Sequence, residues 1–104
     1  MDDRFDPWID GLGSYWDLSD GAMYRLRQGK FDVAGIDDLI GFLRTISIPD
    51  DATIPKRLVS LLWIMPTFME WQIDRVIEHG GSADELRKRI VLVRNELERI
   101  LGGP

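Results

Sequence analysis

The chain has no cysteine and a single histidine among its 104 residues. Without cysteine it can form no disulfide, no thiolate nucleophile and no thiolate metal site, so its fold must be stabilised by the burial of apolar side chains. A secreted protein of this size usually carries disulfides. We therefore expect a location in the reducing cytoplasm.

Residue types that perform catalysis are scarce. His79 is the one histidine, and the residues at helical spacing before it, Arg75 and Val76, are not metal ligands. A serine-histidine-aspartate arrangement would have to use His79, and no nucleophile-elbow motif surrounds any serine. His79 stands near the end of an expected helix, where it would bind free carbonyls. We expect no catalytic residue, no metal site, no cofactor and no enzymatic activity.

Long apolar runs are also missing. The longest uncharged segment has twelve residues, Leu58 to Met69, whereas a membrane span takes about 20. The first residues lack the basic and apolar regions of a signal peptide. We expect no membrane association. The same segment has the length of a buried core helix or of an adhesive helix face.

Positive charge is in deficit, with a net charge of −5. Residues 1–53 hold eleven acidic and five basic residues, for a net charge of −6, while residues 54–104 hold seven acidic and eight basic residues, for a net charge of +1. An acidic surface repels phosphate and attracts basic proteins. We therefore expect no nucleic-acid binding, despite the basic run Arg87-Lys88-Arg89.

The clearest secondary-structure pattern lies at the end of the chain. Ser82 and Glu85 form a capping-box pattern that predicts a helix beginning at Ala83. Apolar residues then recur at alternating spacings of four and three, as on the buried face of a packed helix; they are Leu86, Ile90, Val93, Leu97 and Ile100. The glycines and proline at 102–104 would end this helix.

The uncharged segment predicts a second helix, over 54–79, with Thr53 as its cap and Gly80 as its end. Pro66 lies inside it and removes one hydrogen bond, so we expect a kink or a break near Met65. The short link Gly80-Gly81 then predicts that the last helix folds back antiparallel on 67–79.

Earlier parts of the chain predict shorter helices. Ser19 would cap a helix over 20–28, Asp32 would cap one over 33–46, and 1–18 would form an aromatic and acidic arm or a short helix beginning at Asp6-Pro7. Residues 47–53 read as a loop. The sequence therefore predicts an all-α fold, a single domain over 1–104 with four to five helices and a C-terminal antiparallel helical hairpin.

Ten aromatic residues, four of them tryptophan, suggest a function in protein contact, because aromatic residues are enriched in the centres of interfaces. One hypothesis is a small acidic inhibitor or immunity-type protein that binds a basic protein through Trp8, Asp10, Tyr15, Trp16, Asp17 and Asp20. The alternative is a homodimeric structural or accessory subunit that associates through 58–73, with Trp63, Met69 and Trp71 at its interface. A third interpretation leaves the N-terminal aromatic residues covering the core.

The acidic residues Glu70, Asp74 and Glu78 recur every four positions on one helix face. Like charges at this spacing destabilise a helix unless a basic group lies close. We expect Arg75, or Arg87 and Arg94 of the last helix, to neutralise them.

Overall fold

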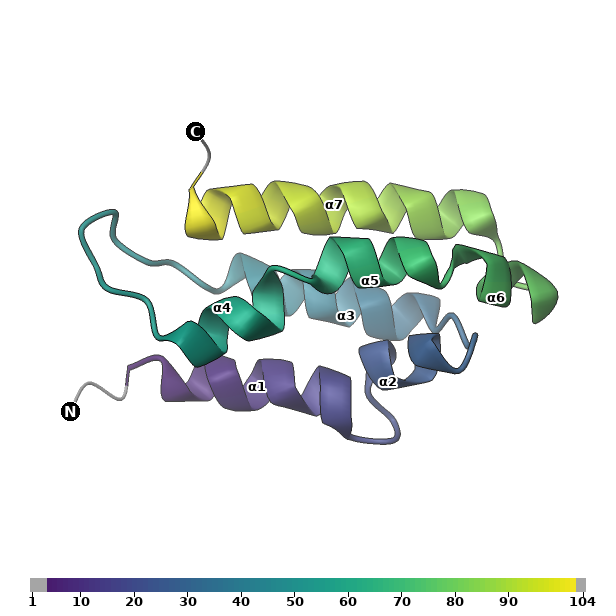
Figure 1. Cartoon of the computed structure of the whole chain (residues 1–104), viewed down its shortest axis with the longest axis horizontal. Coiled ribbons are helices and arrows are strands. Elements are labelled where there is room, and N and C mark those ends of the chain that lie inside the picture. The colour runs from purple at the N-terminus through teal and green to yellow at the C-terminus, as the bar shows by residue number, and fades with distance from the viewer. Residues whose placement is uncertain (1–3, 103–104) are drawn as a thin grey trace.

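The computed structural model describes residues 4–102, and within this range the chain forms seven helices and no strand (Figure 1). In chain order they are α1 (Asp6–Asp17), α2 (Ala22–Arg27), α3 (Val33–Arg44), α4 (Lys56–Leu62), α5 (Met65–Trp71), α6 (Ile73–Glu78) and α7 (Ala83–Leu101). The expected all-α fold is confirmed. Helices α4, α5 and α6 are three pieces of the one helix predicted over 54–79.

That central helix is broken twice. The first break follows Leu62, and its cause is Pro66, which has no N–H to donate to the Leu62 carbonyl and occupies an early position of α5 where no donor is needed. The second break, at Gln72, was not predicted, because glutamine is a good helix former and nothing in the local sequence indicates a break there. The predicted Thr53 cap is wrong: α4 begins at Lys56 after Pro55 and has no side-chain cap.

The C-terminal hairpin is confirmed, with α7 packed antiparallel against α5 and α6 (Figure 1). Gly80 takes a left-handed φ of +83°, which glycine adopts without strain, and ends α6. The Glu85 amide donates to the Ser82 hydroxyl at 3.2 Å, so Ser82 caps α7 as predicted. All five seam residues are buried. Gly102 follows the helix, and the other two residues of the predicted stop signal lie outside the described range.

Helix α3 lies on the other side of α7 and runs parallel to it. Three contacts join the α3 segment to α7: Asp37 pairs with Arg89, Arg44 pairs with Glu96, and the Ile46 carbonyl accepts from Arg99. In each contact the two residues are 52 or 53 positions apart in the sequence. A constant separation is the mark of parallel helices in fixed register. The α3 side chains predicted to be apolar and inward are buried as expected: Ile36, Leu39, Ile40, Leu43 and, just beyond the helix, Ile46.

The two N-terminal helices close the opposite edge, where α1 packs against α2 and α4. The segment 1–18 is therefore a helix from Asp6 onward and not an arm, although Asp6 is its first residue and not its cap; residues 1–3 lie outside the described range. Helix α2 starts at Ala22, after Gly21, and Ser19 does not cap it. The predicted Asp32 cap of α3 is confirmed, because its carboxylate accepts from the Gly35 amide at 3.0 Å.

The described helices form a thin slab, with principal extents of 45, 30 and 19 Å. The short dimension is about two helix diameters, so the slab has two layers, and Figure 1 looks onto one of its broad faces. The accessible surface is 6263 Å², against about 6,000 Å² expected for a folded monomer of this mass. The chain thus covers its own core.

Candidate protein-contact face

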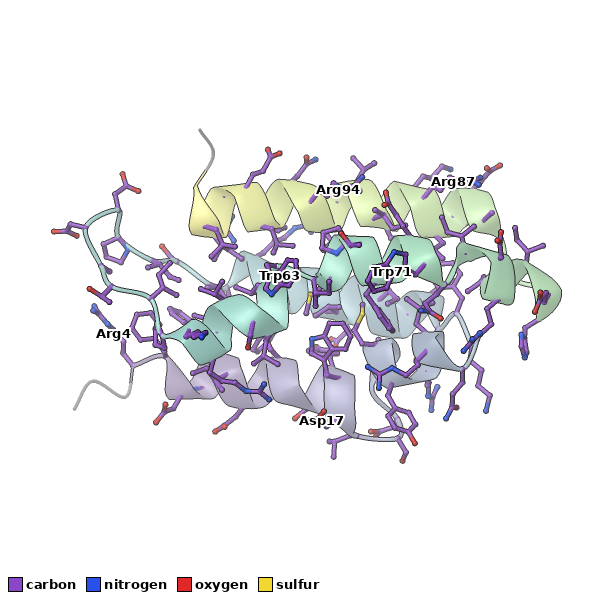
Figure 2. The ribbon with its side chains drawn as sticks, viewed as in Figure 1. Arg4, Asp17, Trp63, Trp71, Arg87 and Arg94 are labelled. Atoms are coloured by element: carbon purple, nitrogen blue, oxygen red, sulfur yellow. The ribbon has the colours of Figure 1, made fainter. Side chains whose placement is uncertain are left out.

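Two tryptophans project from the broad face seen in Figure 2. Trp63 follows the end of α4 and is 60% exposed, and Trp71 ends α5 and is 67% exposed. They belong to different pieces of the broken helix, and Figure 2 shows both on the same broad face. Both side chains are mainly apolar and large, so leaving them in water costs more than leaving any other side chain there.

A groove runs between α5 and α7 on the same face, and Trp63 lines one end of it. At one end it widens into a hollow of about 340 Å³ lined by Glu70, Ile73, Arg87, Ile90, Val91 and Arg94. At the other end is a hollow of about 270 Å³, lined by Trp63, Pro66, Arg94, Leu97, Glu98, Leu101 and Gly102. Arg94 lines both hollows and divides them. We name the surface made by Trp63, Trp71 and this groove the tryptophan face.

Arg94 crosses the groove to reach Glu70, with 2.5 Å between the guanidinium and the carboxylate. This pair joins α7 to α5 and confirms that an arginine of the last helix neutralises one of the three acidic residues on the helix face predicted above. Arg75 does not: its guanidinium donates to the Arg27 carbonyl of α2. Asp74 and Glu78 are exposed to solvent.

The charges that line the groove balance. Glu70 and Glu98 are acidic, and Arg87 and Arg94 are basic. The protein as a whole carries −5, so the tryptophan face is electrostatically unlike the rest of the molecule. It presents a neutral, mostly apolar surface on an acidic protein.

The other two tryptophans pack against the core. The Trp16 indole donates from Nε1 to the Leu61 carbonyl at 3.0 Å, and its ring meets the edge of Phe68 at 4.9 Å between centroids. Leu61 lies in the last turn of α4, where carbonyls lack partners within the helix, so Trp16 supplies the missing donor. Trp8 is half-buried and packs edge-on against Phe5 at 5.9 Å.

Tyr15 also makes its contacts within the chain. Its hydroxyl donates to Asp38 of α3 at 2.7 Å, and its ring lies 5.8 Å from that of Phe42. Partial burial, together with the hydrogen bond to the Asp38 carboxylate and the charge of that carboxylate, raises the pKa of the Tyr15 phenol. The phenol is held protonated, which suits a structural hydrogen bond between α1 and α3.

The three acidic members of the first predicted site are exposed. Asp10 and Asp17 line a groove with Arg57 of α4, and Asp20 lies with Tyr15 and Asp38 around a neighbouring hollow; Ser14 and Leu18 line both. The carboxylates are thus open to solvent, whereas the rings of Trp8, Tyr15 and Trp16 pack against the core.

The second predicted set is corrected at one position. Met69 is fully buried and cannot contact a partner, because residues 65, 68 and 69 form the inward side of α5. Trp63 and Trp71 remain at the surface. The apolar segment thus divides its side chains between the core and the tryptophan face.

His79 occupies the end of α6, and its Nδ1 lies 2.8 Å from the Arg75 carbonyl, so it takes the predicted helix-end position. In residues 4–102 no three histidine, cysteine or carboxylate side chains are grouped as a metal site would need. Over the same range, none of the helices combines the length and apolar character required to cross a bilayer.

Sequence reasoning missed the contribution of α7 to this face. Arg87, Val91, Arg94 and Glu98 follow one another at spacings of four, three and four, so they form a second stripe beside the buried seam. Val91 is 53% exposed in its middle. An apolar residue at stripe spacing among charged ones is the signal in the sequence that points to this face.

Comparison with known proteins adds no further information on this site, since the chain matches no protein-family model, no curated protein and no solved structure.

Proposed function

We propose that this protein is a non-enzymatic interaction domain that acts by binding another protein chain through its tryptophan face. The observation that supports this proposal is the exposure of Trp63 and Trp71, at 60% and 67%, on the same broad face (Figure 2). Tryptophan is the residue type most enriched among the side chains that dominate binding energy at interfaces. No cofactor is required for such a role.

The groove supports the same proposal. An apolar floor with a few charged groups at its rim is the usual composition of a protein interface. Ile73, Ile90 and Leu97 contribute apolar surface to the two hollows, and Arg94 and Glu70 form the polar group between them. Arginine beside tryptophan adds a side chain that is itself favoured at interfaces.

The hypothesis of an acidic inhibitor has less support from the geometry. Its aromatic anchors were to be Trp8, Tyr15 and Trp16, and all three are half-buried against the chain's own core. Carboxylates alone remain for a basic partner, and exposed charge pairs contribute about 0–1 kcal/mol each. We therefore assign the contact surface to α5 and α7. We still expect the protein to act in the cytoplasm, because it has no cysteine.

Site-specific photocrosslinking in the native host tests the proposal. A benzophenone amino acid would replace Trp63 or Trp71 in the full chain, and in a matched control it would replace Leu18, an apolar residue 55% exposed at the end of α1. We expect adducts with protein from positions 63 and 71 and none from 18, with each adduct identified by mass spectrometry. Absence of adducts at both tryptophan positions would overturn the proposal.

A further inference from the structure

We infer that the occupant of the tryptophan face is a second copy of this chain, in a two-fold symmetric dimer. This inference rests on the proposed function, since it names the partner for the same surface. A symmetric pair buries the same patch on both copies, so the patch must complement itself. The tryptophan face meets that requirement in the pattern and the balance of its charges.

Charge complementarity comes from the outer stripe of α7. Arg87 and Glu98 are eleven residues apart, about three turns, so they lie on the same side of the helix at the two ends of the stripe. If two such stripes meet antiparallel, Arg87 faces Glu98 of the partner subunit, and the same pair forms a second time through the symmetry. Val91 and Arg94 then lie beside the axis.

The two tryptophans fit the same axis. Trp63 lies at the end of the groove that also holds Glu98, and α5 runs antiparallel to α7, so Trp71 lies toward the end that holds Arg87. In the sequence, Thr67 is midway between Trp63 and Trp71. The midpoint of Arg87 and Glu98 falls between Val91 and Arg94. Arg94 is joined to Glu70 of α5, three residues from Thr67, so the two midpoints are neighbours across the groove.

The tryptophan face lies on a broad side of the molecule that measures 45 by 30 Å, about 1,350 Å² in outline. That side has room for the roughly 800 Å² that a standard interface takes from each partner. Within it, each copy would bury two tryptophan side chains, which contribute about 150–250 Å² apiece when fully covered.

The balance of charge favours a second copy over a basic protein. The groove has two acidic and two basic lining residues, so it offers no excess negative charge to attract a cationic partner. The excess acid belongs to the first 53 residues, which carry −6. Two acidic copies can therefore approach through a region in which their charges balance.

Sedimentation of the purified full chain over a concentration series tests this inference. We expect a monomer–dimer equilibrium. Trp71→Glu should raise the dissociation constant at least tenfold, and Leu18→Glu, which adds the same charge at a comparably exposed apolar position away from the face, should leave it unchanged.

A charge exchange gives the sharper result. Arg87→Glu alone and Glu98→Arg alone should each weaken the dimer, because each places like charges opposite one another, and the double variant should restore the wild-type dissociation constant. Circular dichroism would confirm that each variant is folded. A monomer at all concentrations, or a double variant no tighter than the single ones, would overturn the inference.

The two proposals fail separately. Crosslinked adducts between positions 63 or 71 and a different protein, with a monomer in sedimentation, would retain the contact face and remove the dimer. Adducts of the chain with itself from those positions support both.

Discussion

Trp16 illustrates how a large aromatic residue can be fixed by one polar contact. The break before Pro66 leaves carbonyls at the end of α4 without helical donors, and the Trp16 indole reaches one of them, on Leu61. The same ring packs on Phe68 of α5. A single side chain of α1 therefore holds two pieces of the broken helix, which explains why it is not available to a partner.

Trp16→Phe should destabilise the protein by about 1–3 kcal/mol, because a partly buried carbonyl loses its donor while most of the apolar contact remains. Urea denaturation followed by circular dichroism would measure the loss. Leu18→Ala is the control, since Leu18 is exposed and lies outside the tryptophan face, and it should change stability by less than about 0.5 kcal/mol. Equal effects of the two substitutions would contradict the role given to the indole.

Glu85 provides a pH-dependent contribution. Its hydrogen bond to Arg89, and then the charge and hydrogen bond of Lys88, lower the pKa of the Glu85 carboxyl. A carboxyl with a lowered folded pKa stabilises the fold above its unfolded pKa of about 4.3, and this stabilisation is lost as the pH falls through the folded pKa. The direction is therefore a loss of stability in acid.

Glu85→Gln should reduce the difference in unfolding free energy between neutral pH and acid, and most of that change should occur below about pH 4.3. Urea titrations at a series of pH values would measure it. Asn95→Gln, an uncharged change at an exposed position of α7, serves as the comparison and should keep the wild-type slope, because it removes no titrating group. If the pH dependence of the unfolding free energy is unchanged in Glu85→Gln, the ion pair with Arg89 is too weakened by solvent to contribute to stability.

At the scale of the elements, two glycines inside helices differ in the space around them. Gly11 of α1 faces Phe42 of α3, and an added Cβ would overlap that ring, lying 2.7 Å from its Cε2 and nearer still to its Cζ. Gly41 of α3 has nothing within 4 Å of the place its Cβ would take. The first glycine lets the Phe42 ring of α3 pack against the α1 backbone, and the second only weakens its own helix.

Gly41→Ala should therefore stabilise the protein by about 0.5–1 kcal/mol, which is the helix-propensity gain. Gly11→Ala has the same intrinsic gain but should destabilise by about 1–3 kcal/mol, because α1 must move away from Phe42. Thermal unfolding of the matched pair would measure both, with a shift of about 4–8 °C per kcal/mol. Shifts of the same sign would refute the close approach.

Elements with a strong local signal were predictable. The five-residue seam of α7, its Ser82 cap and the turn at Gly80 depend on neighbouring residues only, and all three are present. The break at Gln72 was not predictable, because no local preference marks it. The parallel packing of α3 on α7 depends on pairs more than 50 residues apart, such as Asp37 with Arg89, and sequence periodicity carries no information on such pairs.

At the scale of the whole molecule, the candidate site was predictable only as a choice between sets. The sequence predicts two alternative contact sites, one that includes Trp8 and Trp16 and one that includes Trp63, Met69 and Trp71. Composition shows which apolar and aromatic residues are present and does not show which of them are buried. Burial resolves the choice: Met69 and the N-terminal aromatic rings pack inward, while Trp63 and Trp71 stay exposed. The deciding factor is the position of the breaks in the central helix, which set which sides of α4 and α5 face solvent.

The slab shape bears on the same question. A molecule 19 Å thick has little interior for its surface, and two copies joined broad face to broad face would measure about 38 Å in that direction, close to the other two dimensions. Pairing would therefore turn a flat particle into a nearly isometric one. The proportion of apolar surface in contact with water would fall accordingly.

The parallel alignment of α3 and α7 has a kinetic consequence. The two helices are separated by the segment that forms α4, α5 and α6, so their contact closes a long loop, whereas only α6 and a short turn separate α5 from α7. Closing a long loop costs more chain entropy than closing a short one, and non-local contacts slow folding. The C-terminal hairpin should therefore assemble early, with α3 docking afterwards as the slower step that completes the native state.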